Sequence, residues 1–375
     1  MFISLENMRK SLGRTKNNFK KIKKIFPVDV AHEVDRKLDR LQKTTQDFEQ
    51  KISFRHINQY KKYEDKIIPF KLYFGVTNVC NAKCIFCAYK TAEHKKGIMS
   101  FEIFKKGVDE YISMGGKWIA LTPTVGDPLI DPGLFDKIKY AKKHSQIKQI
   151  HFTTNAILFT NAKKYKKTID SGITHVYLSM GDLDKETYIK VYGVDLYEKA
   201  ILGIYHLLKY NKETGEQVII NIGLRTSKKP SETLASEDFN KYIKPFLSKK
   251  VTYSFTPYFD NFGGMIKQEH LIGDMKLGRG NKIKTTPCVK TFEAMILFDG
   301  SVRLCACRLK KTEFDELVIG NINKNTLKEI FFGENAKKVR ERFVQNNLAP
   351  VCKGCSLYRP VKKSWLKRRI KEQKQ

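Results

Sequence analysis

Short apolar segments alternate with longer amphipathic segments through the middle of the chain. Six segments rich in apolar, β-branched and aromatic residues predict strands, at 72–77, 118–121, 149–154, 175–179, 218–224 and 251–255. The intervening sequence predicts helices near 101–114, 133–144, 161–170, 185–209 and 233–247. Strands that alternate with helices form a parallel sheet with the helices packed outside it, so we expect an α/β fold of six β/α units.

The two ends of the chain break this alternation. Basic side chains dominate residues 1–24, where Glu6 is the single acid, and the segment from Lys362, where Glu372 is the single acid. We therefore predict a basic, helical N-terminal extension and a basic tail. The first of these contains interleaved apolar residues, and two interpretations stay open: contact with an anionic membrane surface, or a solvated extension. These apolar residues are Phe2, Ile3, Phe19, Ile22, Ile25 and Phe26.

The 375 residues carry a formal net charge of +32, which bears on the class of partner. Most basic residues are lysines, and no arginine lies between Arg55 and Arg225. Because nucleic-acid readers usually rely on arginine forks, we do not expect a nucleic-acid partner. No run of about 18 apolar residues predicts a membrane span, and the N-terminus does not resemble a signal peptide. We expect a soluble, cytoplasmic enzyme.

Three closely spaced cysteines follow the first predicted strand. Cys80, Cys84 and Cys87 form a C-x3-C-x2-C pattern. Three thiolates at this spacing can hold three irons of a cubane [4Fe-4S] cluster and leave the fourth iron open to a small molecule. A structural zinc site would need a fourth ligand, and a chain without a signal peptide is not expected to form disulfides. The pattern favours a reactive iron-sulfur site.

This motif, its place after the first strand and Phe86 before the last cysteine resemble the radical S-adenosylmethionine (SAM) superfamily. The resemblance implies a partial (β/α)6 barrel of the TIM type, with its site at the carboxyl ends of the strands. It also implies that the open iron binds the amino and carboxylate groups of SAM. One electron, supplied by a flavodoxin- or ferredoxin-type donor, would then cleave SAM to a 5'-deoxyadenosyl radical.

The segment 122–128, which follows the second strand, resembles the Gly-Gly-Glu-Pro segment of the family. Val125 stands in place of the first glycine and Asp127 in place of the glutamate. The resemblance implies that Gly126 and Asp127 hold the ammonium group of SAM. The alternative is an ordinary turn built on Gly-Asp-Pro.

The other strand ends imply further cofactor contacts. The resemblance assigns SAM contacts to Phe86, Asn155 and Ser179. Many relatives place an arginine in the helix after the fourth strand, whereas this chain has Lys, Val and Tyr at 190–192. Arg225, at the end of the fifth strand, is the candidate to anchor the SAM carboxylate instead, because a guanidinium binds a carboxylate with two hydrogen bonds.

The remaining cysteines follow residue 287, and their spacing resembles the C-terminal module called SPASM in its long form and twitch in its short form. No cysteine follows Cys355, so the short form matches better. The resemblance implies one auxiliary [4Fe-4S] cluster, held by Cys288, Cys305, Cys352 and Cys355. A four-cysteine zinc ribbon is the alternative. Cys307 stays unassigned.

The segment 259–264 resembles the Asp-Asn-Trp-Gly-Gly turn of SPASM-type enzymes. Asp260 has two candidate roles in this turn. As a catalytic group it would accept a substrate proton after hydrogen abstraction. As a structural group it would cap the turn.

These motifs divide the chain into four parts. They are a basic helical extension at 1–69, the barrel at 70–265, a small α+β auxiliary-cluster domain at 266–360, and a basic tail at 361–375. We expect an oxidoreductase that abstracts a hydrogen atom from a sugar or cyclitol-type small molecule. The first alternative is a maturase that modifies a peptide or protein. The second is a non-catalytic iron-sulfur or zinc protein that docks on nucleic acid or membrane.

Overall fold

The computed structural model describes residues 2–52, 60–307 and 316–374. Within these ranges, strands form one sheet in the order β6-β5-β4-β3-β2-β1-β7-β8-β9. The strands are β1 Leu72–Phe74, β2 Trp118–Ala120, β3 Gln149–Thr154, β4 His175–Met180, β5 Ile219–Leu224, β6 Val251–Phe255, β7 Ala294–Ile296, β8 Ser301–Leu304 and β9 Val318–Asn321. Strands β1 to β6 are parallel. An α-helix follows each of β1 to β5, whereas β6 leads into 3-10 turns and then β7.

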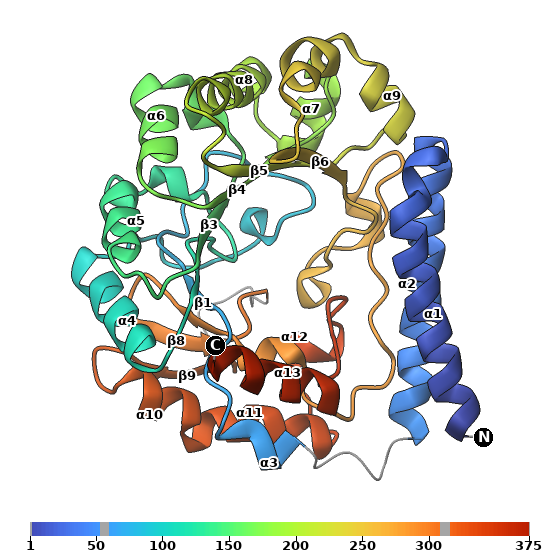
Figure 1. Ribbon diagram of the computed structural model, residues 1–375, viewed down its shortest axis with the longest axis vertical. Helices are drawn as coiled ribbons and strands as arrows, with labels where there is room; N and C mark the ends of the chain where they lie inside the picture. Colours follow the sequence, from blue (N-terminus) through green and yellow to red (C-terminus); the bar gives the residue numbers. More distant parts are fainter. Residues whose placement is uncertain (1, 53–59, 308–315, 375) are drawn as a thin grey trace.

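Helices pack on the outer side of the curved sheet, as Figure 1 shows for α4, α5, α6 and α8. This arrangement confirms the predicted partial barrel. The barrel helices are α4 Phe101–Ser113, α5 Leu134–Lys142, α6 Ala162–Asp170, α7 Lys185–Tyr192, α8 Tyr197–Glu213 and α9 Pro230–Ala235. The others are α1 Phe2–Ile22, α2 Val28–Ile52, α3 Lys61–Glu64, α10 Leu327–Phe332, α11 Glu334–Val344, α12 Pro350–Lys353 and α13 Lys363–Lys374.

Residues along the strands alternate between the outer core and the barrel interior. On β4, Val176 and Leu178 are buried in the core, whereas Tyr177 between them is 36% exposed. The ring of Tyr177 lies 5.5 Å from that of His151 on β3 and 6.5 Å from that of His175. The interior therefore carries polar and aromatic side chains here, unlike the branched apolar layers that fill a complete TIM barrel.

Two predicted helices are wrong in extent. The helix expected at 185–209 is divided into α7 and α8, because Gly193 ends α7 with a positive φ of 67°. The helix expected at 233–247 is replaced by α9, a π-helix at Phe239–Ile243 and a 3-10 turn at Lys244–Phe246. Ser236 has extended backbone after α9, and Pro245 has no N–H to continue a helix.

The C-terminal module continues the barrel sheet. Strand β7 pairs in parallel with β1, and β8 and β9 then add antiparallel strands. The outer residues of β7 join the barrel core, because an added side chain at Gly107 of α4 would meet Ile296. The turn of the β7–β8 hairpin therefore lies beyond the end of β1, whereas Leu304, just before Cys305, is level with Leu72 at the start of β1.

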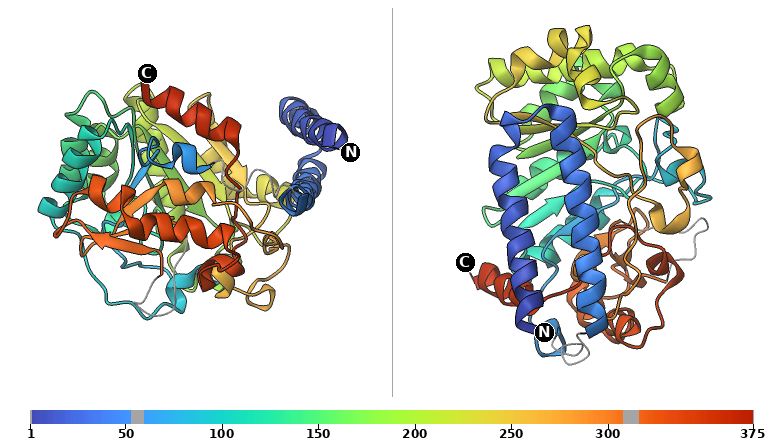
Figure 2. Two further views of the ribbon diagram at one scale, coloured as in Figure 1. Left: turned by 90° about the horizontal axis from the view of Figure 1, so that it is seen from below. Right: turned by 90° about the vertical axis from the view of Figure 1, so that its right-hand side faces the viewer.

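The N-terminal helices α1 and α2 lie side by side along one edge of the molecule (Figure 2). Phe19 of α1 is buried against Ala31 and Leu38 of α2. Helix α2 also binds the barrel, since Arg36 donates hydrogen bonds to the carbonyl oxygen of Pro257 and to Asp274. No helix in the described ranges combines the length and apolarity required to cross a membrane.

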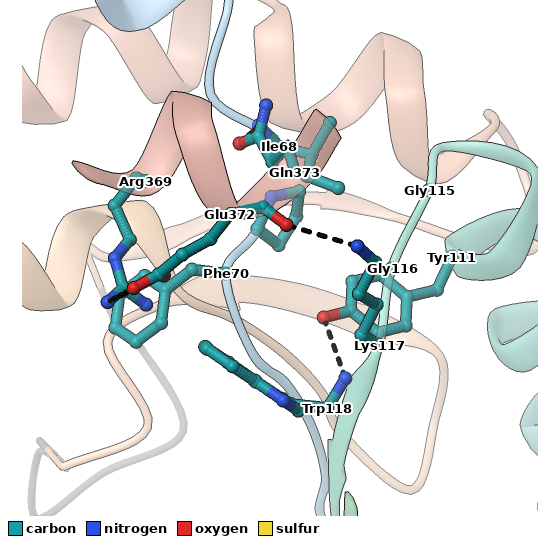
Figure 3. A pocket seen from close by; sticks show the side chains of 11 residues that line it. Ile68, Phe70, Tyr111, Gly115, Gly116, Lys117, Trp118, Arg369, Glu372 and Gln373 are labelled. Atoms are coloured by element: carbon teal, nitrogen blue, oxygen red, sulfur yellow. Dashed lines mark hydrogen bonds and ion pairs between the residues drawn. The ribbon is translucent and has the colours of Figure 1, made fainter. Parts of the chain in front are cut away.

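Most of the segment expected as a basic tail forms helix α13, which packs on the barrel. Figure 3 shows Arg369 beside the rings of Phe70 and Trp118, with cation-to-centroid distances of 5.3 and 5.4 Å. The Lys117 ammonium donates a hydrogen bond of 3.0 Å to the carbonyl oxygen of Glu372. Arg369 of this segment thus takes part in tertiary packing, which its charge alone did not indicate.

Candidate functional site

The loop with the first three cysteines follows β1 at the carboxyl end of the barrel strands. Its backbone is fixed by the end of α7: the N–H groups of Lys83 and Ile85 donate to the carbonyl oxygens of Tyr192 and Val191, both at 2.9 Å. Gly193 permits this approach, because an added Cβ there would lie 2.8 Å from the carbonyl oxygen of Lys83. The break between α7 and α8 therefore lets the end of α7 hold the cysteine loop in place.

The Cys80, Cys84 and Cys87 thiols are partly buried and close enough to affect one another. Burial raises the pKa of all three thiols, that of Cys80 to about 12, and neighbouring thiols add to the shift at Cys80 and Cys84. Arg225 acts in the opposite direction on Cys84 and Cys87. Iron would convert these thiols to thiolates, since metal-bound thiols are deprotonated. A sulfur-only donor set in a largely apolar setting suits an iron-sulfur cluster.

Gly126 lies directly against the cysteine loop. Its φ is 120°, and an added Cβ would stand 2.9 Å from the carbonyl oxygen of Thr77. The N–H of Asp127 donates a 2.8 Å hydrogen bond to the carbonyl oxygen of Val79. Val125, in contrast, does not adopt a positive φ and packs against Ala88. Valine is therefore tolerated where the family has glycine, because the positive φ that favours glycine occurs at Gly126 and not at Val125.

The Asp127 carboxylate is 2% exposed and points into the barrel wall. It accepts hydrogen bonds from the Thr154 hydroxyl at 2.8 and 3.0 Å, from the N–H of Asn155 at 2.9 Å and from the N–H of Leu129 at 3.0 Å. Burial raises the pKa of Asp127, and these donors oppose the shift. The contacts favour the turn-forming role of Asp127, which joins the ends of β2 and β3.

The substitution Asp127→Asn should lower the free energy of unfolding by about 1–3 kcal/mol, because an amide would face buried donors that lose their acceptor. Chemical denaturation of the cluster-free protein measures this change. The control Asp136→Asn, at an exposed position of α5, should leave stability unchanged. Unaltered stability of Asp127→Asn together with weaker SAM binding would instead support the ammonium contact.

Asn155 and Ser179 lie at neighbouring strand ends that face the cysteine loop. The Asn155 amide donates to the Asn81 side chain at 2.7 Å, and its Nδ2 lies 3.9 Å from the Sγ of Cys80. The Ser179 hydroxyl pairs with the Tyr192 hydroxyl at 3.1 Å. Tyr192, at the end of α7, is thus the partner of Ser179.

Arg225 brings a cation to the three thiols. Its guanidinium lies 5.4 Å from the centroid of the Phe86 ring. Its Nε is buried and has no hydrogen-bond partner among the described residues. Arg225 lies near both Cys84 and Cys87, since its charge opposes the rise in the pKa of each thiol. This buried donor fits the cofactor.

The four proposed auxiliary ligands, Cys288, Cys305, Cys352 and Cys355, are only 8–9% exposed. Backbone N–H groups already point at two sulfurs: that of residue 359 at Cys288 and that of residue 357 at Cys355, both at 3.4 Å. Burial raises the pKa of Cys288 to about 11, and the nearby Cys355 adds to the shift. No group of three such donors in the described ranges is arranged for a single metal ion. Four buried thiols, two of them with N–H···S hydrogen bonds, have the donor chemistry of an iron-sulfur cluster.

The turn at Asp260 joins the barrel to the C-x2-C loop of the module. The Ser356 hydroxyl and the Phe262 N–H donate to Asp260 Oδ1, at 2.8 and 3.1 Å. The Asn261 amide donates to the carbonyl oxygen of Gly354 at 2.6 Å. Asp260 therefore caps the turn and binds the module in this structure.

Cys307 lies beside buried charged residues. Burial raises the pKa of Glu293 to about 7, against the effect of Lys290, whose ammonium binds Glu293 at 2.8 Å. The Cys307 thiol contributes to the pKa shifts of both residues, so it lies near them. Its surroundings are polar, unlike those of a thiol that only fills a core.

A cavity of about 560 Å³ lies between the chain that follows β1 and β2 and the hairpin of β7 and β8. On one side it is lined by the ends of β1 and β2, including Thr77 and Val125, and on the other by Met295 and Arg303 of the hairpin. Thr124 connects these sides, since its hydroxyl donates to the carbonyl oxygen of Ala306 at 2.9 Å. The cavity is therefore bordered both by the candidate SAM segment and by the chain next to an auxiliary ligand.

Comparisons with known families match both cysteine groups. The model of the radical SAM superfamily matches residues 74–230, and a model described as an iron-sulfur cluster-binding domain matches residues 288–356. The chain belongs to the radical SAM superfamily. Its cofactors are SAM and [4Fe-4S] clusters, the second of them auxiliary. The match to an iron-sulfur domain replaces the zinc-ribbon alternative.

Individual relatives differ in function. The chain is 29% identical over 173 residues to a GTP 3',8-cyclase of Clostridium perfringens, covering 45% of this chain and 48% of the cyclase. The chain thus spans about half the length of that radical SAM relative. It is 24% identical to a tungsten-containing aldehyde ferredoxin oxidoreductase cofactor-modifying protein of Pyrococcus furiosus, over 76% of this chain and 87% of that protein.

A solved structure shares the fold. BtrN in complex with AdoMet and 2-DOIA superposes with a TM-score of 0.50 at 16% identity, over 77% of this chain and 93% of BtrN. At this identity the likeness concerns the fold alone. It agrees with the partial barrel and the continuous C-terminal sheet described above.

Sequence reasoning missed several residues that shape the site. Tyr192 bonds to Ser179, Asn261 holds the C-x2-C loop, and Thr124 joins the hairpin. Tyrosine, asparagine and threonine are common at solvated positions, so their types carried no signal. The departure from the family at 190–192 was the one sequence feature that pointed to Tyr192.

Proposed function

We propose that this chain is a radical SAM enzyme that oxidises a sugar or cyclitol-type small molecule. The observation that carries the proposal is the cavity of about 560 Å³, which borders the candidate SAM segment at Thr124 and Val125 and the hairpin that precedes Cys305. When bound, SAM and its cluster supply a 5'-deoxyadenosyl radical that removes a hydrogen atom from the substrate.

The chain's own residues would have separate roles. Arg225 would hold the SAM carboxylate, Gly126 would let the backbone approach the ammonium group, and Asn155 would orient the loop at Cys80. Oxidation of an alcohol to a ketone also releases a proton and an electron, and the four-cysteine site is placed to house the electron acceptor. For Asp260 to take the proton, it would have to exchange its bonds to Phe262 and Ser356. A flavodoxin- or ferredoxin-type protein would reduce the first cluster.

The test is an anaerobic assay of the reconstituted, reduced protein with sugars, aminocyclitols and short peptides. A small-molecule substrate should increase 5'-deoxyadenosine release and appear as a ketone product. Stimulation by peptides alone would favour the maturase, which remains the second candidate. Absence of 5'-deoxyadenosine under all conditions would favour a non-catalytic iron-sulfur protein.

The substitution Arg225→Met should weaken SAM binding by about 1.5–3 kcal/mol, because a charge-assisted hydrogen bond to the carboxylate is lost. Arg225→Lys should retain part of the affinity, since a lysine keeps the charge but not the fork. Equilibrium binding of SAM to the reconstituted protein measures both, with the exposed Arg368→Met as control. Equal SAM affinity in all of these proteins would show that Arg225 does not bind SAM.

We also propose that the turn between α1 and α2 contacts an anionic membrane surface. Four apolar side chains there are 41–79% exposed, namely Ile22, Ile25, Phe26 and Val30. Exposed lysines flank them at 20, 21 and 23, which suits anionic lipid. The side chains of Phe2 and Ile3 lie outside the described part of the structure, and Phe19 is buried in the helix pair. The protein should sediment with phosphatidylglycerol vesicles but not with phosphatidylcholine vesicles, and Ile25→Glu should abolish this binding. Equal sedimentation with both kinds of vesicle would contradict the proposal.

A further inference from the structure

A buried lysine binds the C-x2-C loop that carries Cys352 and Cys355. The Lys284 side chain is 4% exposed. Its ammonium donates to the carbonyl oxygens of Cys352, Lys353 and Cys355, at 2.6, 2.7 and 3.2 Å. Burial of an ammonium is costly unless it is hydrogen-bonded, so these carbonyls and the cation hold one another in place. Two of the three carbonyls belong to auxiliary ligands.

Helix α2 holds the segment that carries Lys284. The buried Gln50 accepts hydrogen bonds at Oε1 from the N–H groups of Thr285 and Thr286, at 3.2 and 3.1 Å. Asp47 accepts from the Asn281 amide at 3.1 Å and from the Ile283 N–H at 3.3 Å. These contacts fix the backbone on both sides of Lys284.

The same helix also reaches the C-x2-C loop directly. The Lys43 ammonium donates to the carbonyl oxygen of Ser356 at 3.1 Å, and the Tyr358 hydroxyl donates to Gln50 at 3.2 Å. Helix α2 thus makes polar contacts with residues around the auxiliary ligands. This helix lies outside the residues that the two family models match.

We propose that Lys284, set in position by α2, is a positioning residue for the auxiliary cluster. It shapes the loop that presents Cys352 and Cys355, and its positive charge favours the reduced form of a cluster bound there, because net charge and hydrogen bonds near a cluster set its potential. Helix α2 is thereby part of the auxiliary site. The inference rests on the auxiliary cluster of the proposed function and does not depend on the substrate.

The experiment compares Lys284→Met, Lys284→Gln and Lys282→Met after anaerobic reconstitution. Iron per chain, electron paramagnetic resonance and the auxiliary reduction potential are measured, with circular dichroism as the folding check. Lys284→Met should lose about half of the iron, while the first cluster keeps its SAM-dependent spectrum. Lys284→Gln retains donors but no charge, so it should keep most of the iron and shift the auxiliary potential to more negative values. Lys282→Met removes an exposed charge two residues away and should match the wild type.

Full iron and an unchanged auxiliary potential in both Lys284 variants would overturn the proposal. If Lys284→Met does not fold, the potential of Lys284→Gln decides alone. Gln50→Ala should also lower the iron content of the auxiliary site, as Lys284→Met does. Full iron content in this variant would overturn the role assigned to α2. A wild type that holds both clusters but oxidises no small molecule would contradict the proposed function and leave this inference intact.

Discussion

Replacing Cys80, Cys84 and Cys87 together by alanine should abolish SAM cleavage and remove about half of the bound iron. Each cubane holds four irons, so the wild type should approach about eight irons per chain and the variant about four. No ligand is shared with the auxiliary set, which begins at Cys288 in a different part of the fold. The measurements are iron content and 5'-deoxyadenosine release after anaerobic reconstitution.

The matched control is Cys307→Ala, which removes a thiol assigned to neither ligand set. It should retain the iron count of the wild type. A wild type that contains stoichiometric zinc and no iron, when produced under anoxic and iron-replete conditions, would contradict the assignment of both clusters.

Replacing Cys352 and Cys355 by alanine should stop product formation while some 5'-deoxyadenosine still forms. The first site keeps all of its thiols, so SAM can still be cleaved, but the substrate loses its electron acceptor or its correct position. Because the loop of Cys352 and Cys355 is also bonded to Asn261 and Lys284, its substitution is expected to loosen the wall of the barrel mouth.

The assay counts 5'-deoxyadenosine and product separately in one anaerobic reaction, and circular dichroism verifies folding. Product per 5'-deoxyadenosine should fall steeply relative to the wild type. A well-folded double variant that keeps the full product yield would exclude the auxiliary role, and the residues beside Cys307 would become the next candidates.

The strands could be predicted from sequence because each is a short apolar or β-branched run between turn residues, and β3 and β6 begin and end where this pattern does. The division of α7 from α8 could not be predicted in this way. Its cause is the approach of Gly193 to the backbone of Lys83, about a hundred residues earlier in the chain. Local periodicity contains no information on such a contact.

The sequence by itself determined the chemistry of the first cysteine group, because ligand spacing within a short loop is a local property of the chain. The four later ligands are spread over residues 288–355, and their residue types alone left a zinc ribbon open. The sequence also indicated Gly126 and Arg225, which stand at strand ends that a parallel barrel must bring together. Only the tertiary structure decided that Asp127 turns into the barrel wall and that α2 and Lys284 support the auxiliary loop. Buried polar groups require partners, and partners for these groups come from segments distant in sequence whose residue types are unremarkable by themselves.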